Sequence, residues 1–316
     1  MKFLKNFIKI EGDASHREFY RNPKKNSIII IANKDKNKNL LVYDAINKIL
    51  IKNNIIAPKL ISQNYLKNCI EVEDLGEKTI YQLLKDKRKN NYSILVKILE
   101  ILKKIQLIKN RKIKNFKNKN FQIKEYKKII LFNETKLFCD WYVPKNLSKK
   151  KYSLFNLKFK KEIRFLLSNL KYKNDTFVHR DFHVSNLVFG LNKKIGVIDN
   201  QDALIGNKAY DLASLIDDVR FKTTISLKNK IYNYYIRSNK RINVNNFKND
   251  FEILSVLRNL KIIGIFTRLA LRDNKTKYLK LIPYAWEMIN YRMSQNKVFG
   301  NLNYLLINNF PRFSGK

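Results

Sequence analysis

Hydrophobic residues change their spacing along the chain near Gly76, and the change predicts two kinds of structure. Before Gly76, the β-branched run at residues 27–34 and the apolar run at residues 69–73 each predict a strand. The segment at about residues 39–52 has helical spacing. After Gly76, longer segments place apolar residues at helical intervals, at residues 79–86, 92–108, 121–138, 152–170 and 257–289, the last with a polar break at Asp273–Lys275. The basic linker at residues 109–120 is expected to be a solvated loop, and the tail at residues 301–316 a frayed end. We therefore expect an α+β protein with a small strand-rich part and a larger, mostly helical one.

A polar loop and a short hairpin interrupt the helical part. The loop reads His179-x-Asp181-x-x-x-x-Asn186, and the hairpin that follows (LVF, turn GLNKK, IGVID) ends in Asp199. Phosphoryl transfer from ATP needs a carboxylate that orients the attacking hydroxyl and oxygen ligands that hold Mg²⁺. The pattern therefore indicates Asp181 as the catalytic base and Asn186 and Asp199 as Mg²⁺ ligands. Taken singly, Asp181 could cap a helix and Asp199 could end a strand, but their combination in this order favours the catalytic interpretation.

Three segments carry a family resemblance. HRDFHVSN, IDNQDA and AYDLASLIDDVR, all within residues 179–220, resemble the aminoglycoside phosphotransferase/choline kinase-like family, and within it the bacterial anomeric cell-wall sugar kinases. The resemblance runs from residue 12 to about residue 286. It implies a protein kinase-like two-lobed fold, with a small antiparallel-sheet lobe at residues 1–74 and a mostly helical lobe at residues 75–316. It also implies ATP-dependent transfer to the anomeric hydroxyl of N-acetylmuramate or N-acetylglucosamine, as in cell-wall recycling.

The start of the chain, GDASHREFY, resembles the beginning of the same sugar kinases. A glycine turn between strands lets backbone N–H groups approach phosphates, although a single Gly-Asp pair usually marks only a turn. The resemblance implies that the following residues bind the nucleotide: Gly12, Asp13, Ala14, Ser15 and Arg17.

The connector EDLG also matches the family, and its backbone at Glu73 and Leu75 is expected to bind the adenine edge. The chain departs from the protein-kinase pattern just before it. The strand at residues 27–34 has isoleucines where a lysine is expected, and the helix after it contains Asp44 but no glutamate. We therefore expect Arg17 or Lys34 to supply the missing cation.

Acceptor residues are implied by the segment FNETKLFCDWYV at residues 132–143, which resembles the acceptor-side helix of the family. Glu134 and Asp140 are candidates to bind sugar hydroxyls, and Trp141 could stack on an apolar sugar face. An equally good alternative is that Leu137, Phe138 and Trp141 form one core-facing stripe.

Further candidates flank the metal carboxylate and lie near the C-terminus. The resemblance places Gln201 and Asp202 near the acceptor. It also suggests Arg258 or Arg268 for the lactyl carboxylate of N-acetylmuramate, although the stems of these arginines could simply pack while their charges reach solvent.

Residues that support the catalytic loop are also implied by the family. His179 is expected to be a buried strut for the loop, and Asp211 to brace it. Asn200 stands where phenylalanine is common, so we expect a looser metal loop with no ligand lost.

Composition limits the other possibilities. The hydrophobic fraction of 45% suits a globular protein, and no apolar run reaches the ~20 residues of a membrane span. The N-terminus does not resemble a signal peptide, and two cysteines, Cys69 and Cys139, fit a reducing cytoplasm. The net charge of +39 suggests nucleic acid, but the lysines are spread evenly and no nucleic-acid motif accompanies them. We therefore expect a cytoplasmic enzyme with ATP and Mg²⁺ as cofactors, a small-molecule sugar substrate, no membrane partner and an open oligomeric state.

Three alternatives remain. The acceptor could be another small molecule, such as an aminoglycoside, choline or homoserine. A protein kinase is disfavoured because no APE motif follows Asp199. The chain could also be a non-catalytic, basic nucleic-acid-binding protein on a kinase scaffold, which the missing strand lysine supports and the complete catalytic set opposes.

Overall fold

The computed structural model describes residues 7–10, 17–33, 38–86, 91–190 and 194–313. The chain divides into two compact units, which are treated separately: unit 1 (Met1–Lys124 and Thr176–Ile205) and unit 2 (Glu125–Asp175 and Gly206–Lys316). This division places the polar loop at residues 179–186 in the same unit as the N-terminal sheet. The expected lobe boundary at residues 74/75 stays a prediction.

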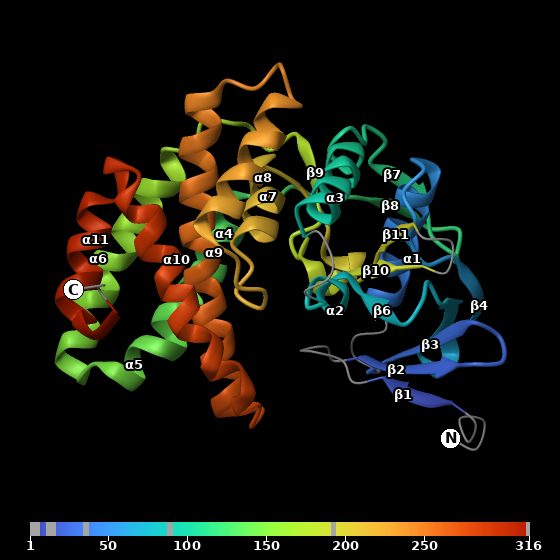
Figure 1. Ribbon diagram of the computed structural model, residues 1–316. Coiled ribbons are helices and arrows are strands. Elements are labelled where there is room, and N and C mark those ends of the chain that lie inside the picture. The colour runs from blue at the N-terminus through green and yellow to red at the C-terminus, as the bar shows by residue number, and fades with distance from the viewer. Residues whose placement is uncertain (1–6, 11–16, 34–37, 87–90, 191–193, 314–316) are drawn as a thin grey trace. The chain divides into compact units, whose positions relative to one another are not determined.

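Unit 1 is built around a five-stranded sheet with the order β1-β2-β3-β5-β4 (Figure 1). Every neighbouring pair in it is antiparallel. The strands are β1 (Ile8–Ile10), β2 (Arg17–Asn22), β3 (Ser27–Ala32), β4 (Leu60–Asn64) and β5 (Cys69–Glu73). The antiparallel N-terminal sheet expected from the sequence is therefore confirmed.

Helix α1 (Lys38–Lys52) covers this sheet. Leu40 and Tyr43 of the helix pack with Ile30, Ile70 and Val72 of the two central strands. The isoleucines of β3 are nearly all buried, which explains why this run carries no charged residue.

The rest of unit 1 consists of short strands and two helices. The helices are α2 (Ile80–Leu84) and α3 (Asn91–Gln106). β6 (Lys78–Thr79), β10 (Leu187–Phe189) and β11 (Ile195–Val197) form one small sheet, and β9 (Thr176–Val178) pairs with β12 (Leu204–Gly206). The hairpin predicted on either side of the GLNKK turn is therefore confirmed.

The basic segment at residues 109–120 differs from its expected form as a solvated loop. Its ends form a hairpin of β7 (Lys112–Lys114) and β8 (Asn120–Gln122). Asn115 closes the hairpin, since its side-chain oxygen accepts hydrogen bonds from the amides of Lys117 and Lys119. The high lysine content indicated a solvated loop, so the sequence analysis missed the local turn that Asn115 stabilises.

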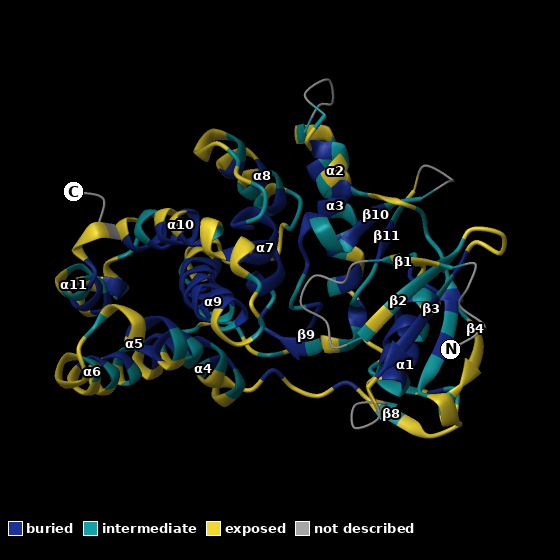
Figure 2. Ribbon diagram, turned by 90° about the horizontal axis from the view of Figure 1, so that it is seen from below, coloured by how far each residue is buried: buried dark blue, intermediate teal, exposed yellow. Residues whose placement is uncertain are grey.

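Unit 2 is helical in its described residues. Its α-helices are α4 (Lys128–Leu137), α5 (Val143–Asn146), α6 (Lys149–Ser168), α7 (Ala209–Ile216), α8 (Ile225–Arg237), α9 (Val244–Arg272), α10 (Ile282–Ser294) and α11 (Gly300–Asn309). Most of α9 is buried, as its dark blue ribbon in Figure 2 shows. The predicted break at Asp273–Lys275 separates α9 from the turn that leads into α10. α11 was not expected, since its segment resembled a frayed end; Leu302, Leu305 and Leu306 bury its inner face.

A π-helical turn (Phe138–Tyr142) joins α4 to α5. The wider turn places Phe138 and Tyr142 in an aromatic core with Trp286 and Phe310, while Trp141 stays half-buried. Gly264 of α9 makes this packing possible. A Cβ at that position would lie 2.3 Å from the carbonyl carbon of Leu137, so only glycine allows the two backbones to come this close.

No helix in the described part of the chain is long and apolar enough to cross a membrane.

Candidate functional site

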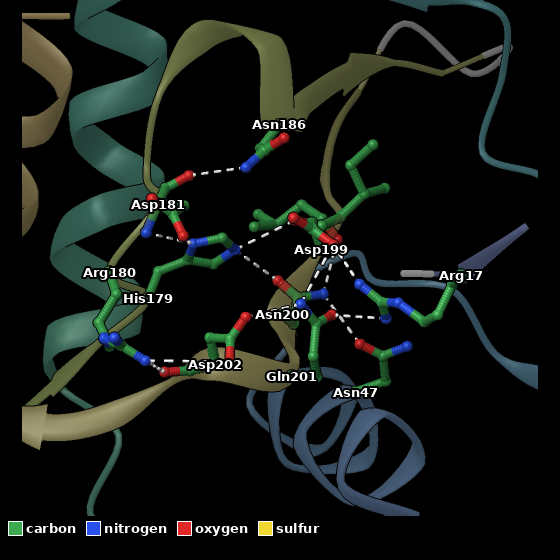
Figure 3. Close-up of polar contacts among 12 residues, drawn as sticks. Arg17, Asn47, His179, Arg180, Asp181, Asn186, Asp199, Asn200, Gln201 and Asp202 are labelled. Carbon is green, nitrogen blue, oxygen red and sulfur yellow. Dashed lines mark hydrogen bonds and ion pairs between the residues drawn. The ribbon is translucent and has the colours of Figure 1, made fainter. Parts of the chain in front are cut away.

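The polar loop of unit 1 is held in a fixed shape by its own backbone. The amide of His183 donates a hydrogen bond to the carbonyl of Asp181 at 3.0 Å. Nδ2 of Asn186 donates to the same carbonyl, also at 3.0 Å. The carboxamide nitrogen is thus used within the loop, and the carboxamide oxygen is the atom left to face a ligand (Figure 3).

The segment at residues 198–202, which carries Asp199 and Asn200 and is called the metal loop here, runs beside the polar loop. The amide of Ile198 donates to the carbonyl of Asn186 at 3.0 Å, so Asn186 and Asp199 come from adjacent segments. Asp199 has left-handed backbone angles (φ 62°, ψ 42°), and Arg180 also has a positive φ of 75°. Such angles are costly for residues other than glycine and gather at functional sites. One of the two strained residues, Arg180, therefore precedes the candidate base, and the other, Asp199, is itself a candidate metal ligand.

Arg17 reaches Asp199 from strand β2. Its guanidinium forms an ion pair with Oδ1 of Asp199 at 2.8 Å and donates to Oε1 of Gln201 at 2.9 Å. The Arg17 side chain is only 9% exposed, whereas that of Asp199 is 39% exposed. Nε2 of Gln201 in turn donates to Asp199 and to Asp202. The predicted cation Arg17 therefore lies against the predicted metal ligand.

A buried polar chain lies behind these residues. Nε2 of His179 is 2.8 Å from Oδ1 of Asn200 and 3.1 Å from the carbonyl of Ile198. The amide of Asp181 donates to Nδ1 of the same ring, which places the ring proton on Nε2. Nδ2 of Asn200 then donates to Oδ1 of Asn47 at 2.8 Å and to the carbonyl of Val197. The sequence predicted a looser metal loop, but the structure differs. The side-chain amide of Asn200 holds the loop by hydrogen bonds, where a phenylalanine would hold it by apolar packing.

Sequence reasoning missed Asn47. It lies on the buried face of α1 with Leu40, Tyr43 and Leu50, where an amide is unusual. An amide among the apolar residues of this helix face was the available signal. Its neighbour Tyr43 is also buried, and burial raises the pKa of the Tyr43 phenol to about 12. The Tyr43 phenol therefore stays neutral beside Arg17, whose guanidinium lies over its ring.

The connector after β5 is fixed by Arg21, which sequence reasoning also missed. Arg21 forms an ion pair with Asp74 and donates to the carbonyl of Gly76 at 3.1 Å. Oδ1 of Asp74 accepts from the amide of Gly76 at 3.0 Å, and Gly76 has φ 131°, which favours glycine. The backbone at Glu73 and Leu75 is thus held in a defined turn. Gly12, Asp13, Ala14, Ser15 and Lys34 lie outside the described residues.

Asp44 is the acidic residue of α1, which contains no glutamate, and it forms its ion pair within unit 1. It is 2% exposed and forms an ion pair with Lys48 one turn along the helix, at 2.9 Å. Burial raises the pKa of the Asp44 carboxyl, which the Lys48 ammonium opposes. Asp44 is therefore a packing residue of α1 in this structure.

The acceptor candidates Glu134, Asp140 and Trp141 lie in unit 2. Oε2 of Glu134 accepts from the hydroxyl of Tyr126 and pairs with Lys261 at 3.0 Å. Asp140 is exposed and pairs with Lys136 at 2.8 Å. Glu134 is thus the better held of the two acids.

Two further candidates are buried in unit 2. Asp211 lies in the first turn of α7 and is 1% exposed. Arg258 lies within α9 and is 4% exposed, and its Nη1 has no hydrogen-bond partner among the described residues. A buried guanidinium nitrogen in this state has a strong preference for an anion or an acceptor.

The sequence-predicted residues therefore divide between the units. Unit 1 brings together Arg17, His179, Asp181, Asn186, Asp199, Gln201 and Asp202 (Figure 3). Unit 2 contains Glu134, Asp140, Trp141, Asp211 and Arg258.

The donor set in unit 1 suits a hard cation. Within the described part of the chain, no three His, Cys, Asp or Glu side chains gather as a metal centre. Mg²⁺ does not require such a cage, since it takes one or two protein oxygens together with phosphate oxygens and water. The Asn186 oxygen and the half-exposed Asp199 carboxylate fit that requirement.

Comparison with known proteins agrees with this geometry. Residues 7–241 match the phosphotransferase enzyme family. An N-acetylmuramate/N-acetylglucosamine kinase of Neisseria meningitidis is 31% identical over 186 residues, which cover 57% of this chain and 54% of that protein. The match thus spans about half the length of the Neisseria protein. A protein of the same description from Pseudomonas aeruginosa is 23% identical over 95% of this chain and 87% of its own length.

Solved structures show the same fold. The choline kinase LicA from Streptococcus pneumoniae superposes with a TM-score of 0.63 over 92% of this chain and 96% of that chain. The sequence identity is 12%, so this likeness concerns the fold alone. The kinase-like α+β fold expected from the sequence is therefore confirmed.

Proposed function

The chain belongs to the phosphotransferase enzyme family, and from this premise we propose that it transfers the γ-phosphoryl group of ATP to a sugar hydroxyl. The acceptor that we propose is the anomeric hydroxyl of N-acetylmuramate or N-acetylglucosamine. The observation that carries the proposal is the grouping of Asp181, Asn186 and Asp199 on two adjacent loops of unit 1. The names of the Neisseria and Pseudomonas relatives support the choice of sugar.

Asp181 acts as the catalytic base in this proposal. Its amide is tied to His179 and its carbonyl receives hydrogen bonds from His183 and Asn186, so the backbone that carries the carboxylate is held from both sides. The carboxylate orients the acceptor hydroxyl in line with the γ-phosphorus and takes its proton as the new bond forms. Most of the acceleration then comes from positioning and from electrostatic stabilisation.

Asn186 and Asp199 would hold Mg²⁺ through one oxygen each. Bound Mg²⁺ would supply positive charge at the β- and γ-phosphates as the phosphoryl group leaves. Asn186 is oriented for this task by its own amide nitrogen, which is bound to the carbonyl of Asp181. Asp199 is oriented by Gln201 and by its left-handed backbone.

Arg17 is the proposed replacement for the absent strand lysine. It already lies at Asp199, so its guanidinium would face the phosphates with a short side-chain movement. Gly12, Asp13, Ala14 and Ser15 would cover the phosphates, and the backbone of Glu73 and Leu75 would bind the adenine edge. The ion pair between Arg21 and Asp74 supports the last assignment, because it fixes the connector.

The sugar-binding residues in this proposal are Glu134, Asp140, Trp141, Gln201, Asp202 and Arg258. Arg258 would pair with the lactyl carboxylate of N-acetylmuramate, and its unsatisfied Nη1 supports that role. Asp211 would brace the catalytic loop and His179 would act as its buried strut. We further propose that the protein works in the cytoplasm without a nucleic-acid partner.

A substrate panel tests the function. The protein is incubated with ATP and Mg²⁺ and with N-acetylmuramate, N-acetylglucosamine, kanamycin, choline or homoserine, and products are identified by mass. We expect a mass increase of one phosphoryl group on the two amino sugars. Phosphorylation of kanamycin, choline or homoserine alone would assign another acceptor. RNA binding that weakens with salt, together with no ATP turnover on any acceptor, would favour the non-catalytic alternative.

A further inference from the structure

Among the described residues, helix α1 lacks the ion pair that protein kinases use to attach this helix to the nucleotide site. The interior of β3 contains isoleucines, and Asp44 of α1 pairs with Lys48 of its own helix. Some other contact must hold α1 against the polar loops of the candidate site. One contact that does so is a hydrogen bond between two buried amides, Asn47 of α1 and Asn200 of the metal loop.

This contact belongs to a continuous polar chain. Oδ1 of Asn47 accepts from Nδ2 of Asn200 at 2.8 Å, and Nδ2 of Asn47 donates to the carbonyl of Pro58 at 3.0 Å. Oδ1 of Asn200 accepts from Nε2 of His179, whose other nitrogen accepts from the amide of Asp181. The chain therefore runs from the carbonyl of Pro58, through α1 and the metal loop, to the proposed base. Figure 3 shows its part from Asn47 to Asp181.

Both amides use their oxygen and their nitrogen in hydrogen bonds. The nitrogen of Asn200 donates to Asn47 and to the carbonyl of Val197, and its oxygen is taken by His179. Asn200 is 0% exposed and Asn47 is 3% exposed, so water does not compete for these bonds. A buried amide that loses its partner costs the full desolvation of the group, which makes such a chain sensitive to the position of each member. Displacement of α1 would therefore be transmitted to residue 200, the immediate neighbour of Asp199.

We propose that Asn47 and Asn200 are positioning residues that set the Mg²⁺ affinity of Asp199 by fastening the metal loop to α1. The proposal rests on the phosphotransferase function, since it assigns these amides a task in the same site. The pair does the work of the absent lysine–glutamate contact with neutral groups. Outer groups that orient a ligand typically change metal affinity by about 10–100-fold when they are removed.

The test is a double-mutant cycle of Asn47→Leu and Asn200→Leu in the full-length chain. Leucine has the same branching at Cγ as asparagine but cannot form hydrogen bonds, and the double variant leaves neither amide without its partner. Asn53→Leu is the matched control, because Asn53 also uses its side-chain amide, donating to the carbonyl of Ile49, but makes no contact with the metal loop that the structure describes. Each protein is titrated with Mg²⁺ in the presence of a non-hydrolysable ATP analogue, by calorimetry. Binding is the readout, so the result does not depend on which sugar is phosphorylated.

We expect each single variant to raise the half-saturating Mg²⁺ concentration by about 10-fold or more. The double variant should have a half-saturating Mg²⁺ concentration no higher than that of the weaker-binding single variant, since each substitution removes the same hydrogen bond between residues 47 and 200. Asn53→Leu should bind like the wild type. A lowered thermal midpoint with unchanged Mg²⁺ dependence would reduce the pair to a packing role, and additive effects of the two substitutions would refute a shared path.

A second measurement uses the wild-type protein alone. Side-chain amide resonances of Asn47 and Asn200 are followed by NMR while Mg²⁺ and the ATP analogue are added. We expect both amides to shift together with metal saturation. A shift of Asn200 without any change at Asn47 would overturn the coupling to α1.

Discussion

Two buried polar clusters, one in each unit, differ in charge. Unit 1 buries neutral amides and an imidazole, in the chain of Asn47, Asn200 and His179. Unit 2 buries full charges: Asp217 accepts from Arg292 at 2.7 Å and pairs with Lys228 at 3.3 Å. Both clusters are almost inaccessible to solvent, so the difference lies in charge and not in depth.

The difference follows from what each cluster joins. The charged cluster in unit 2 connects the end of α7 with α8, α9 and α10, through Lys228, Ser255 and Arg292 respectively. No candidate site residue takes part in this cluster, so its charges do not act directly on the groups proposed to bind Mg²⁺ or substrate. The neutral chain in unit 1 ends beside Asp181 and Asp199 and adds no further charge to the ion pair of Arg17 and Asp199. We infer that unit 1 supports its candidate site from behind with neutral groups, whereas the cluster of unit 2 uses charge for packing.

The largest expected effect is that of Asp181→Asn in unit 1. The amide keeps the size and the hydrogen-bonding reach of the side chain but cannot accept the acceptor proton. We expect turnover to fall by about 10²–10⁴-fold, the usual range for loss of a general base, with ATP affinity retained. Rates and nucleotide affinities of the two proteins provide the check. Retention of most of the activity would show that Asp181 is not the base.

The corresponding change in unit 2 is Asp217→Asn. Burial alone would raise the pKa of Asp217, but Arg292 and Lys228 outweigh it and hold that pKa well below its ordinary value. Removal of one partner from such a buried cluster costs about 3–5 kcal/mol of unfolding free energy. Denaturant unfolding should reveal this loss, whereas Mg²⁺-dependent nucleotide binding well below the thermal midpoint should be unchanged.

The pH dependence of this stabilisation has a definite sign. The folded pKa of Asp217 is depressed, so its contribution is present above the ordinary aspartate pKa of about 3.9 and is lost as the pH falls toward the folded value. The Asn variant should therefore lose less stability than the wild type on acidification. Equal acid sensitivity of the two proteins would contradict the role of the cluster.

Gly264→Ala tests the close packing of unit 2 without altering charge. The added methyl group would lie 2.5 Å from the carbonyl oxygen of Leu137, so the π-helical turn or α9 must shift. We expect a loss of about 1–3 kcal/mol, as for other overpacked interiors. Thermal unfolding measures it, with Gly300→Ala as the control because a Cβ there meets nothing within 4 Å. Equal midpoints for the two variants would contradict the packing argument.

The smallest effect concerns Glu252 in α9. Burial raises the pKa of this carboxyl to about 7, although Lys248, Asn296 and Arg292 oppose the shift. A raised carboxyl pKa contributes stability that is complete below the ordinary value of about 4.3 and is lost as the pH rises through about 7. Glu252→Gln should therefore stabilise the protein at pH 8, on the order of 1–2 kcal/mol, and do little at pH 5. A gain of the same size at both pH values would rule out this titration.

The sequence was sufficient where structure depends on neighbours along the chain. β5 begins and ends at the predicted residues, Cys69 and Glu73, because Ile70 and Val72 alternate with polar residues as in a half-buried strand. The polar residues at Asp273–Lys275 likewise interrupt the apolar spacing, and α9 ends there. The spacing of Asp181 and Asn186 also anticipated their shared loop, in which Asn186 donates to the carbonyl of Asp181.

Features that depend on distant contacts were missed. Asn47 and Asn200 are separated by 153 positions, and neither residue alone indicates the other. The π-helical turn at Phe138–Tyr142 fits the core only because Gly264 allows α9 to approach. α11 was overlooked because its polar composition resembles a loose tail, whereas the buried side chains of Leu302 and Leu306 hold it as a helix.

The most direct test of the central claim is a ³¹P NMR time course of the wild-type protein with ATP, Mg²⁺ and N-acetylglucosamine or N-acetylmuramate. We predict that the γ-phosphate signal of ATP is replaced by a sugar phosphate monoester whose phosphorus couples to the anomeric proton. Coupling to the proton of another ring position would correct the proposed hydroxyl. Release of inorganic phosphate alone, or an unchanged ATP spectrum, would contradict the account that the polar loops of unit 1 transfer phosphate to a sugar.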